Sequence, residues 1–319
     1  MTVEEQFDVA IVGAGFSGLC MGIKLQEAGI DSFVILEKAD EVGGTWRENT
    51  YPGCACDVQS HLYSFSFEGI PEWSRKFAPS NEIFDYVRRV TDKHALRSHI
   101  RFGHEVVHAA FDEQAGLWRI RSKAGDTVSA RAFVLGTGPL HVPMIPEIPG
   151  LDTFQGKAFH SSRWAHDYDF RGKRVASIGT GGSAIQYVPQ IASDVEQLHV
   201  FQRSAPWILP KPDRPYSELE RALFRVSPQL RTLHRAWLYL RNEARVLPIM
   251  NPRLAKILEK VASHYLRSIV EDPSLIDALT PDYTIGCKRV LLSNDYYQVF
   301  NRPNVELVTE AVAHIRETS

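Results

Sequence analysis

Two short clusters of glycine residues are the first candidates for chemistry in this sequence. They are Gly13-Ala14-Gly15-Phe16-Ser17-Gly18 and Gly179-Thr180-Gly181-Gly182-Ser183-Ala184. Each cluster follows a short apolar run and precedes a helix-like stretch. Glycine allows a tight turn and a close backbone approach, and the N-terminus of the next helix offers free N–H groups and a positive dipole end to an anion. Both clusters therefore predict a loop that binds a pyrophosphate. A plain strand-to-helix corner is the alternative for each.

The residue at the end of the following strand distinguishes the two clusters. Glu37 lies 24 positions after Gly13, and Arg203 lies 24 positions after Gly179. A carboxylate at this point accepts hydrogen bonds from ribose hydroxyls and repels a 2'-phosphate, whereas an arginine binds that phosphate through charge-assisted hydrogen bonds. The first site is thus predicted to bind FAD or NAD. The second is predicted to bind NADP, with Ser204 adding a hydroxyl contact to the phosphate.

Strand–helix–strand units must position these loops, so the fold class is predicted to be α/β. Strands are expected at residues 7–12, 32–36, 174–178 and 198–201, with a helix between the members of each pair. Alternating segments at 117–122 and 128–135 predict a strand meander attached to the first unit. We predict two dinucleotide-binding domains of Rossmann-like, three-layer architecture, at residues 1–145 and 150–319.

The second domain is expected to carry a helical insert at about 217–279. Arginines recur four residues apart along it, as at Arg231 and Arg235, and this spacing predicts a solvated helix face. Strands are expected to resume at about 283–289 and 305–308. Between the two domains, the run 143–150 holds three prolines and indicates the crossing from one to the other.

Composition excludes several other classes of protein. The 36 basic and 38 acidic side chains leave a net charge of -2, which favours neither nucleic acid nor an anionic membrane as a partner. The most apolar helical run, around 237–240, is interrupted by arginines and is too short to span a bilayer. Four cysteines without a secretory leader favour reduced thiols and a cytoplasmic location. Nothing in the sequence indicates the oligomeric state.

The cysteines also argue against thiol chemistry and against a metal site. Cys54 and Cys56 are separated by one residue, which is too close for the two-residue gap of redox or zinc hairpins. We expect both to be structural. A disulfide reductase with the same two-domain plan is disfavoured because the sequence has no Cys-x-x-Cys.

Further motifs resemble the Baeyer-Villiger monooxygenases and their relatives, the flavin-containing monooxygenases. They are Gly43-Gly44-Thr45-Trp46, Tyr51-Pro52-Gly53, Cys56-Asp57, Phe154 to Trp164, Gly286-Cys287-Lys288-Arg289, Tyr296-Tyr297 and Asn301 to Val305. The segment ending at Trp164 is similar to the Baeyer-Villiger fingerprint, in which Phe, Gly, His and Trp recur at this spacing. Ala165 departs from the Pro or Asp that is usual in the family. Trp164 favours the Baeyer-Villiger group, because the simpler flavin-containing monooxygenases tend to carry Tyr or Phe there.

The resemblance covers nearly all of residues 5–310 and implies both the cofactors and the reaction. NADPH would reduce FAD, the reduced flavin would activate O2, and an oxygen atom would be inserted next to a ketone carbonyl to give an ester or lactone. The final segment of the FAD domain in the family has no counterpart in this sequence, so we expect a truncated member. Oxygenation of nitrogen or sulfur, and a flavoprotein without catalytic activity, are the alternatives.

Residue roles follow from the same resemblance. Arg289 is expected to be the catalytic cation and Asp57 to pair with it, while Lys288 joins Arg203 at the 2'-phosphate. His160 is expected to act in domain linkage. The residues predicted to contact FAD or NADPH are Gly13, Gly15, Phe16, Ser17, Gly18, Glu37, Gly44, Thr45, Trp46, Asp57, Tyr63, Val106, Gly179, Thr180, Gly181, Gly182, Ser183, Ala184, Gln186, Arg203, Ser204 and Lys288.

Overall fold

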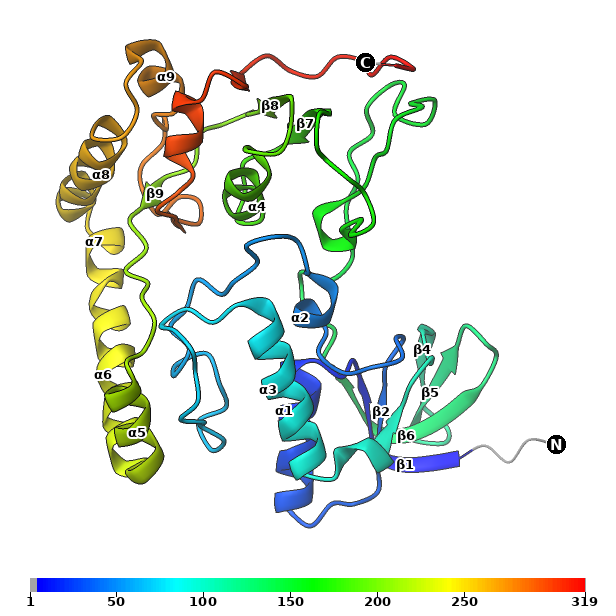
Figure 1. Ribbon diagram of the computed structural model, residues 1–319. Coiled ribbons are helices and arrows are strands. Elements are labelled where there is room, and N and C mark those ends of the chain that lie inside the picture. Colours follow the sequence, from blue (N-terminus) through cyan, green and yellow to red (C-terminus); the bar gives the residue numbers. More distant parts are fainter. Residues whose placement is uncertain (1–4, 319) are drawn as a thin grey trace. The chain divides into compact units, whose positions relative to one another are not determined.

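The structure is a computed structural model that describes residues 5–318, and it consists of two compact units (Figure 1). The first unit comprises the chain up to Thr50 together with Ser80–Pro143, and the second comprises Tyr51–Pro79 and the chain from Met144 onward. The division after Pro143 lies in the proline-marked run. The segment 51–79, which ends 100 positions before the second glycine cluster, nevertheless belongs to the second unit.

A six-stranded mixed sheet forms the centre of the first unit. Its strands are β1 (Glu5–Val12), β2 (Phe33–Leu36), β3 (Ile100–Arg101), β4 (Val106–Asp112), β5 (Leu117–Ser122) and β6 (Thr127–Leu135), in the order β3-β2-β1-β6-β5-β4. β1 runs parallel to β2 and β6, whereas β5 is antiparallel to both of its neighbours. The predicted strand meander is therefore confirmed as β4, β5 and β6. Ala10, Ile120 and Val128 form part of the apolar cluster of this sheet.

Helices of the first unit fix the glycine loop at the carboxyl end of β1. They are α1 (Phe16–Glu27), α2 (Thr45–Glu48) and α3 (Ser80–Lys93), with a 3-10 turn η1 (Leu96–His99). α1 buries Leu19 and Ile23. At Gly22 an added Cβ would lie 3.1 Å from the Cδ1 atom of Ile35, so α1 packs closely on β2. Phe16 stacks on Tyr86 of α3, with ring centroids 6.1 Å apart.

The second unit repeats the strand–helix–strand arrangement. Its elements are β7 (Arg174–Ile178), α4 (Ala184–Ile191), β8 (Gln197–Phe201), β9 (Ile208–Leu209), β10 (Leu291–Leu292), β11 (Val305–Val308) and the 3-10 turns η2 (Ser161–Arg163) and η3 (Tyr297–Asn301). The parallel order is β11-β8-β7, and β9 pairs in parallel with β10. α4 lies beside β7 and β8 (Figure 1), and Val188, Leu198 and Val200 join it to this sheet in one buried cluster.

Five helices form the predicted insert. They are α5 (Glu218–Val226), α6 (Pro228–Ala244), α7 (Val246–Met250), α8 (Pro252–Arg267) and α9 (Pro273–Ala278), and α5 to α8 follow one another as a column (Figure 1). Sequence signals set their ends. Ser217 and Glu220 form a capping box at α5, and Ser227 and Asn251 cap α6 and α8 just before a proline.

Two expectations about this part of the chain are wrong. No strand covers 283–289, because Gly286 has φ = +96° and Cys287 N donates to Thr284 O at 3.1 Å, which closes a turn. The arginines do not form a uniformly solvated face. Arg235 Nη1 donates to His61 O at 2.7 Å, and Arg231 Nη1 donates to Phe224 O at 2.9 Å. These partly buried guanidinium groups therefore donate to backbone carbonyls of other segments of the chain.

Among residues 5–318, no helix is both long and apolar enough to cross a membrane.

Candidate functional site

The first glycine loop is packed tightly against backbone atoms of the first unit. Gly13 has φ = +97°, and an added Cβ would lie 2.7 Å from Gly136 O. At Gly18 an added Cβ would lie 1.9 Å from Gly13 O. Gly136 N in turn donates to Val12 O at 2.8 Å. The fold of the first unit therefore requires glycine at 13 and 18, whether or not a ligand binds.

Gly15 differs from these two glycines because it faces open space. An added Cβ there would meet only Gly44 Cα within 4 Å, at 3.9 Å. Gly44 is the N-cap of α2 at φ = +52°, followed by Thr45 and Trp46, and neither Gly15 at α1 nor Gly44 at α2 has a side chain that caps its helix. The start of α1, where no side chain caps the N–H groups, thus adjoins a cradle that only a side chain at Gly15 would fill, whereas Trp46 N and Arg47 N of α2 already donate to Gly43 O and Gly44 O. This geometry suits a phosphate.

Glu37 lies at the end of β2 and is nearly buried, with 4% of its surface exposed. Its Oε2 atom accepts from Ala14 N at 2.8 Å, and its Oε1 atom accepts from Ala39 N at 3.0 Å and from Arg47 Nη1 at 3.4 Å. Each carboxylate oxygen accepts about two hydrogen bonds. Oε2 therefore keeps a lone pair for a ribose hydroxyl, while the other contacts fix the carboxylate beside the glycine loop. Val106, at the start of β4, packs against the apolar cluster of the same sheet.

The second glycine loop is open. Gly179 has φ = +102°, and neither it nor Gly181 has any atom within 4 Å of an added Cβ. Ser183 is the N-cap of α4 and makes no side-chain cap. Gln186 links this loop to the segment 51–57, because its Oε1 accepts from Ala55 N at 2.7 Å and its Nε2 donates to Gly182 O at 3.0 Å. Both ends of this predicted contact residue are thus engaged by the protein itself.

Lys288 and Thr180 both contact Ser204, which lies three residues after the end of β8. Lys288 Nζ donates to Ser204 Oγ at 3.0 Å, and Ser204 O accepts from Thr180 Oγ1 at 3.4 Å. The Arg203 side chain is exposed and forms no hydrogen bond or ion pair within residues 5–318. Pairing of β9 with β10 sets Ile208 beside Leu291, which brings the segment after Arg203 next to the segment after Lys288. The structure therefore brings Lys288 into contact with Ser204, the residue after Arg203, although the two lie far apart in sequence.

Arg289 forms the predicted contact with Asp57. Arg289 Nη2 donates to Asp57 Oδ2, and both residues belong to the second unit. The arginine side chain is 64% exposed, whereas that of Asp57 is 31% exposed. The aspartate thus holds the guanidinium while leaving most of it accessible. Tyr63, six residues after Asp57, is half-buried, and its N–H donates to Gln59 O at 2.8 Å.

Lys211 is a site residue that the sequence analysis does not identify. Its ammonium lies 5.0 Å from the centroid of the Phe77 ring. Burial lowers the pKa of Lys211, and the carboxylates of Asp213 and Asp57 oppose that shift. Asp57 therefore interacts with a second cation besides Arg289. No sequence signal indicates this, because the segments containing Phe77 and Lys211 meet only in the folded chain.

Cysteine chemistry does not fit this site. The four cysteines form no disulfide, and Cys54 and Cys56 are 6% and 3% exposed. Burial raises the pKa of Cys56 to about 12, so its reactive thiolate form is scarce. The structural role predicted for both residues agrees with this burial. His160 has a local role, because its Nδ1 accepts from Ser162 N at 3.1 Å at the start of η2.

Comparison with known proteins assigns the chain to a family. A family model described as pyridine nucleotide-disulphide oxidoreductase matches residues 10–222. A Baeyer-Villiger monooxygenase of Pseudomonas aeruginosa is 49% identical over 305 residues, which is 95% of this chain, and one of Streptomyces coelicolor is 48% identical over 98% of this chain. The chain belongs to the Baeyer-Villiger monooxygenase family. It spans 58% and 60% of the lengths of these two relatives.

Solved structures of this family agree. A steroid monooxygenase bound to NADP is 35% identical with a TM-score of 0.86, and the match covers 98% of this chain and 68% of that one. The OTEMO complex with FAD and NADP is 31% identical with a TM-score of 0.86, over 97% of this chain and 67% of that one. The predicted fold class, α/β with two dinucleotide-binding domains and a helical insert, is confirmed.

Proposed function

We propose that this chain carries the FAD and NADPH sites of an enzyme that uses O2 to convert a ketone into an ester or lactone. One observation carries the proposal. The adjacent residues Lys288 and Arg289 contact Ser204 and Asp57, respectively. One short loop therefore offers one cation beside Arg203, suited to a 2'-phosphate, and a second cation held by a carboxylate. The four cysteines, present as thiols, also support a cytoplasmic location.

The first glycine loop is proposed to hold FAD. The open space at Gly15, bordered by Gly44, would accommodate the pyrophosphate, and Glu37 Oε2 has a lone pair left for the ribose. The N–H groups that begin α1 would bind the phosphate oxygens. Phe16, Ser17, Thr45, Trp46 and Val106 complete the proposed contacts in this unit.

The second glycine loop is proposed to hold NADPH. Gly179 and Gly181 leave the loop open to a pyrophosphate at the start of α4. Arg203 would bind the 2'-phosphate through a charge-assisted fork, Lys288 would add a point charge, and Ser204 would add a hydroxyl. When bound, the two cofactors supply the hydride transfer and the activation of O2.

Arg289 is proposed to be the catalytic residue. Insertion of oxygen next to a carbonyl develops negative charge on the reacting oxygen atoms, and a fixed cation stabilises this charge without reorganisation during the reaction. One well-placed donor of this kind contributes about 3 to 4 kcal/mol. Arginine is suited to the role because it keeps its charge where a lysine can lose it. Asp57 is proposed to orient the guanidinium.

The test compares products formed per NADPH consumed. The purified chain is supplied with FAD, NADPH and O2, and with either a cyclic ketone or a thioether. Ester or lactone from the ketone supports the proposal. Sulfoxide alone would favour heteroatom oxygenation, and absence of NADPH-dependent turnover would favour a flavoprotein without catalytic activity.

Arg289→Ala separates the catalytic role from a structural one. It should lower ester formation about 100- to 1000-fold while FAD stays bound, and any remaining NADPH oxidation should release hydrogen peroxide. Arg225→Ala, at an exposed position on α5, is the matched control and should keep the wild-type ratio of ester to NADPH. An unchanged ratio in Arg289→Ala would remove this arginine from the mechanism.

A further inference from the structure

We propose that Tyr283 is a positioning residue that sets coenzyme selectivity by holding the Lys288 ammonium over its ring. This inference rests on the proposed function, because it concerns the 2'-phosphate site of NADPH. Lys288 Nζ lies 4.4 Å from the centroid of the Tyr283 ring, and the same nitrogen donates to Ser204 Oγ at 3.0 Å. These two contacts define where the charge lies.

The ring holds this cation without competing with a phosphate for it. A carboxylate partner would neutralise the ammonium and would have to be displaced by an incoming anion. Lys288 forms no ion pair anywhere in the part of the chain that the structure describes, and its side chain is exposed. A cation–π contact and a neutral hydroxyl restrict a flexible four-carbon side chain and leave its charge available.

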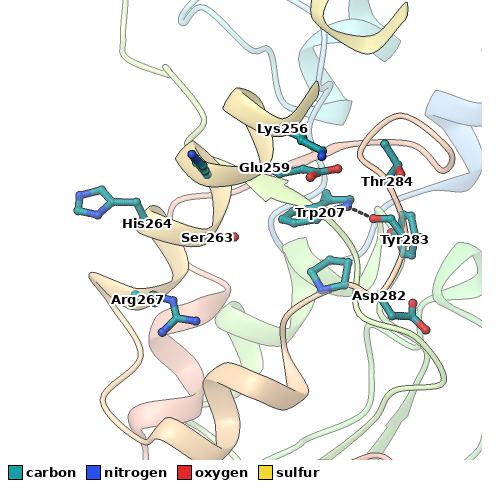
Figure 2. Close-up of a pocket in the computed structure, with 11 residues that line it drawn as sticks. Trp207, Lys256, Glu259, Ser263, His264, Arg267, Asp282, Tyr283 and Thr284 are labelled. Atoms are coloured by element: carbon teal, nitrogen blue, oxygen red, sulfur yellow. Dashed lines mark hydrogen bonds between the residues drawn. The ribbon is translucent and has the colours of Figure 1, made fainter. Parts of the chain in front are cut away.

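Tyr283 is itself held from behind by Trp207. The Trp207 indole Nε1 donates to Tyr283 O at 2.8 Å, and Figure 2 shows this bond, with Trp207 lying between α8 and the loop that carries Tyr283. Trp207 is 6% exposed, and it packs with Ala255 and Ala262 of α8. A buried aromatic side chain is a rigid support, so the position of the Tyr283 backbone is well defined.

The loop that joins Tyr283 to Lys288 is closed at both ends by the same tryptophan. Leu291 N donates to Trp207 O at 2.8 Å, while Trp207 Nε1 binds the carbonyl of Tyr283. Between these ends, Ile285 N donates to Glu259 Oε1 of α8 at 3.0 Å, and Gly286 turns the chain with φ = +96°. The loop thus folds Lys288 back over Tyr283, five residues earlier in the sequence.

Selectivity follows from where the held charge acts. A fixed ammonium beside Arg203 favours a 2'-phosphate and gains little from the 2'-hydroxyl of NAD. Loss of the ring should free the Lys288 side chain and weaken NADP+ binding about 2- to 5-fold, the range for a cation–π contact at an exposed site. Binding of NAD+ should change little. Because the ring provides the contact, Tyr283→Phe should behave like the wild type.

The experiment is calorimetric titration of the 319-residue chain with NADP+ and with NAD+. The variants are Tyr283→Leu, Tyr283→Phe, Lys288→Ala and the double variant Tyr283→Leu/Lys288→Ala. Tyr239→Leu, at a 54% exposed position on α6, is the matched control. We expect Tyr283→Leu to raise the Kd of NADP+ alone, Tyr283→Phe and Tyr239→Leu to match the wild type, and Tyr283→Leu to have no further effect once Lys288 is alanine.

The outcomes separate this inference from the proposed function. If the wild type binds NADP+ and NAD+ equally, the 2'-phosphate site is wrong and the inference fails with it. If the wild type prefers NADP+ and Tyr283→Leu has the same ratio of the Kd of NAD+ to the Kd of NADP+, only the inference is wrong. Equal weakening of both coenzymes by Tyr283→Leu, or an additive effect in the double variant, would mean that Tyr283 supports the loop without acting through Lys288.

Discussion

The two glycine loops share a sequence pattern but differ in what surrounds them. In the first, side chains at Gly13 and Gly18 would lie 2.7 Å and 1.9 Å from backbone oxygens. In the second, Gly179 and Gly181 have no atom within 4 Å of an added Cβ. The same fingerprint therefore serves two purposes. The first loop needs glycine for its own packing, whereas the second needs it for turn conformation at Gly179 and leaves the space proposed for a ligand open.

The residues proposed to distinguish the coenzymes, Glu37 and Arg203, differ in the same way. Glu37 is buried and accepts hydrogen bonds from Ala14, Ala39 and Arg47. Arg203 is exposed and makes no such contact in residues 5–318. The carboxylate is thus part of the first unit's structure before any ligand binds. The arginine is proposed to gain its partner from a ligand, so mutations in the two loops should separate stability from binding.

The largest effect is expected from Gly18→Ala. Its Cβ would overlap Gly13 O, so the turn between β1 and α1 must shift. We expect a loss of about 3 kcal/mol in stability of the first unit, and a melting temperature lower by about 6 to 12 °C. Gly181→Ala is the matched change in the other loop and should leave the melting temperature unchanged. Similar melting temperatures for both variants would contradict the difference between the loops.

Gly15→Val should abolish FAD binding while the first unit stays folded. The cradle at Gly15 has room for a side chain, because an added Cβ meets only Gly44 Cα at 3.9 Å. A branched side chain would occupy the space proposed for the pyrophosphate. The variant should therefore purify colourless, and the flavin absorption band near 450 nm is the measurement. Gly69→Val, at a position with no atom within 4 Å of an added Cβ, should purify yellow. A full flavin band in Gly15→Val would show that FAD binds elsewhere.

The sequence predicts the elements around the loops well, because strand, glycine turn and helix are local signals. β5, β7 and β11 have the bounds expected from alternating or apolar runs. The equal spacing of Glu37 and Arg203 follows from the same local repeat. The pairing of Asp57 with Arg289 is different, because only the family resemblance implied it and the structure shows the contact.

Other features depend on contacts that local patterns do not contain. The spacing of Arg231 and Arg235 marks one helix face, but it does not show that Arg235 meets a carbonyl at His61. The burial of Lys211 likewise depends on its contact with Phe77, a residue that is distant from it in the sequence. A turn at Gly286 stands where a strand was expected. The prediction is wrong because apolar alternation does not reveal a positive φ. Long-range hydrogen bonds and burial therefore limit what the sequence predicts.

Arg203→Ala tests the second loop with an intermediate effect. Loss of a charge-assisted contact costs about 1.5 to 3 kcal/mol, so NADP+ should bind about 10- to 150-fold more weakly. NAD+ should bind almost as it does to the wild type, because it has no 2'-phosphate. Titration with the two coenzymes measures this ratio. Equal weakening of both would mean that Arg203 supports the loop and does not recognise the phosphate.

The smallest expected effect compares Glu37→Gln with Arg203→Ala in stability, without any nucleotide. Glutamine keeps the shape of glutamate but replaces one acceptor oxygen with an NH2 group. Because donors approach both carboxylate oxygens of Glu37, that group must face either Ala14 N or the donors at Ala39 and Arg47. A buried donor then faces another donor, which should cost about 1 to 2 kcal/mol. Arg203→Ala removes an exposed side chain and should change stability by less than about 0.5 kcal/mol. Thermal unfolding of both variants, prepared free of flavin and coenzyme, measures the difference. Equal melting temperatures would mean that the Glu37 carboxylate does not stabilise the first unit, and that its role depends on the ligand as that of Arg203 does.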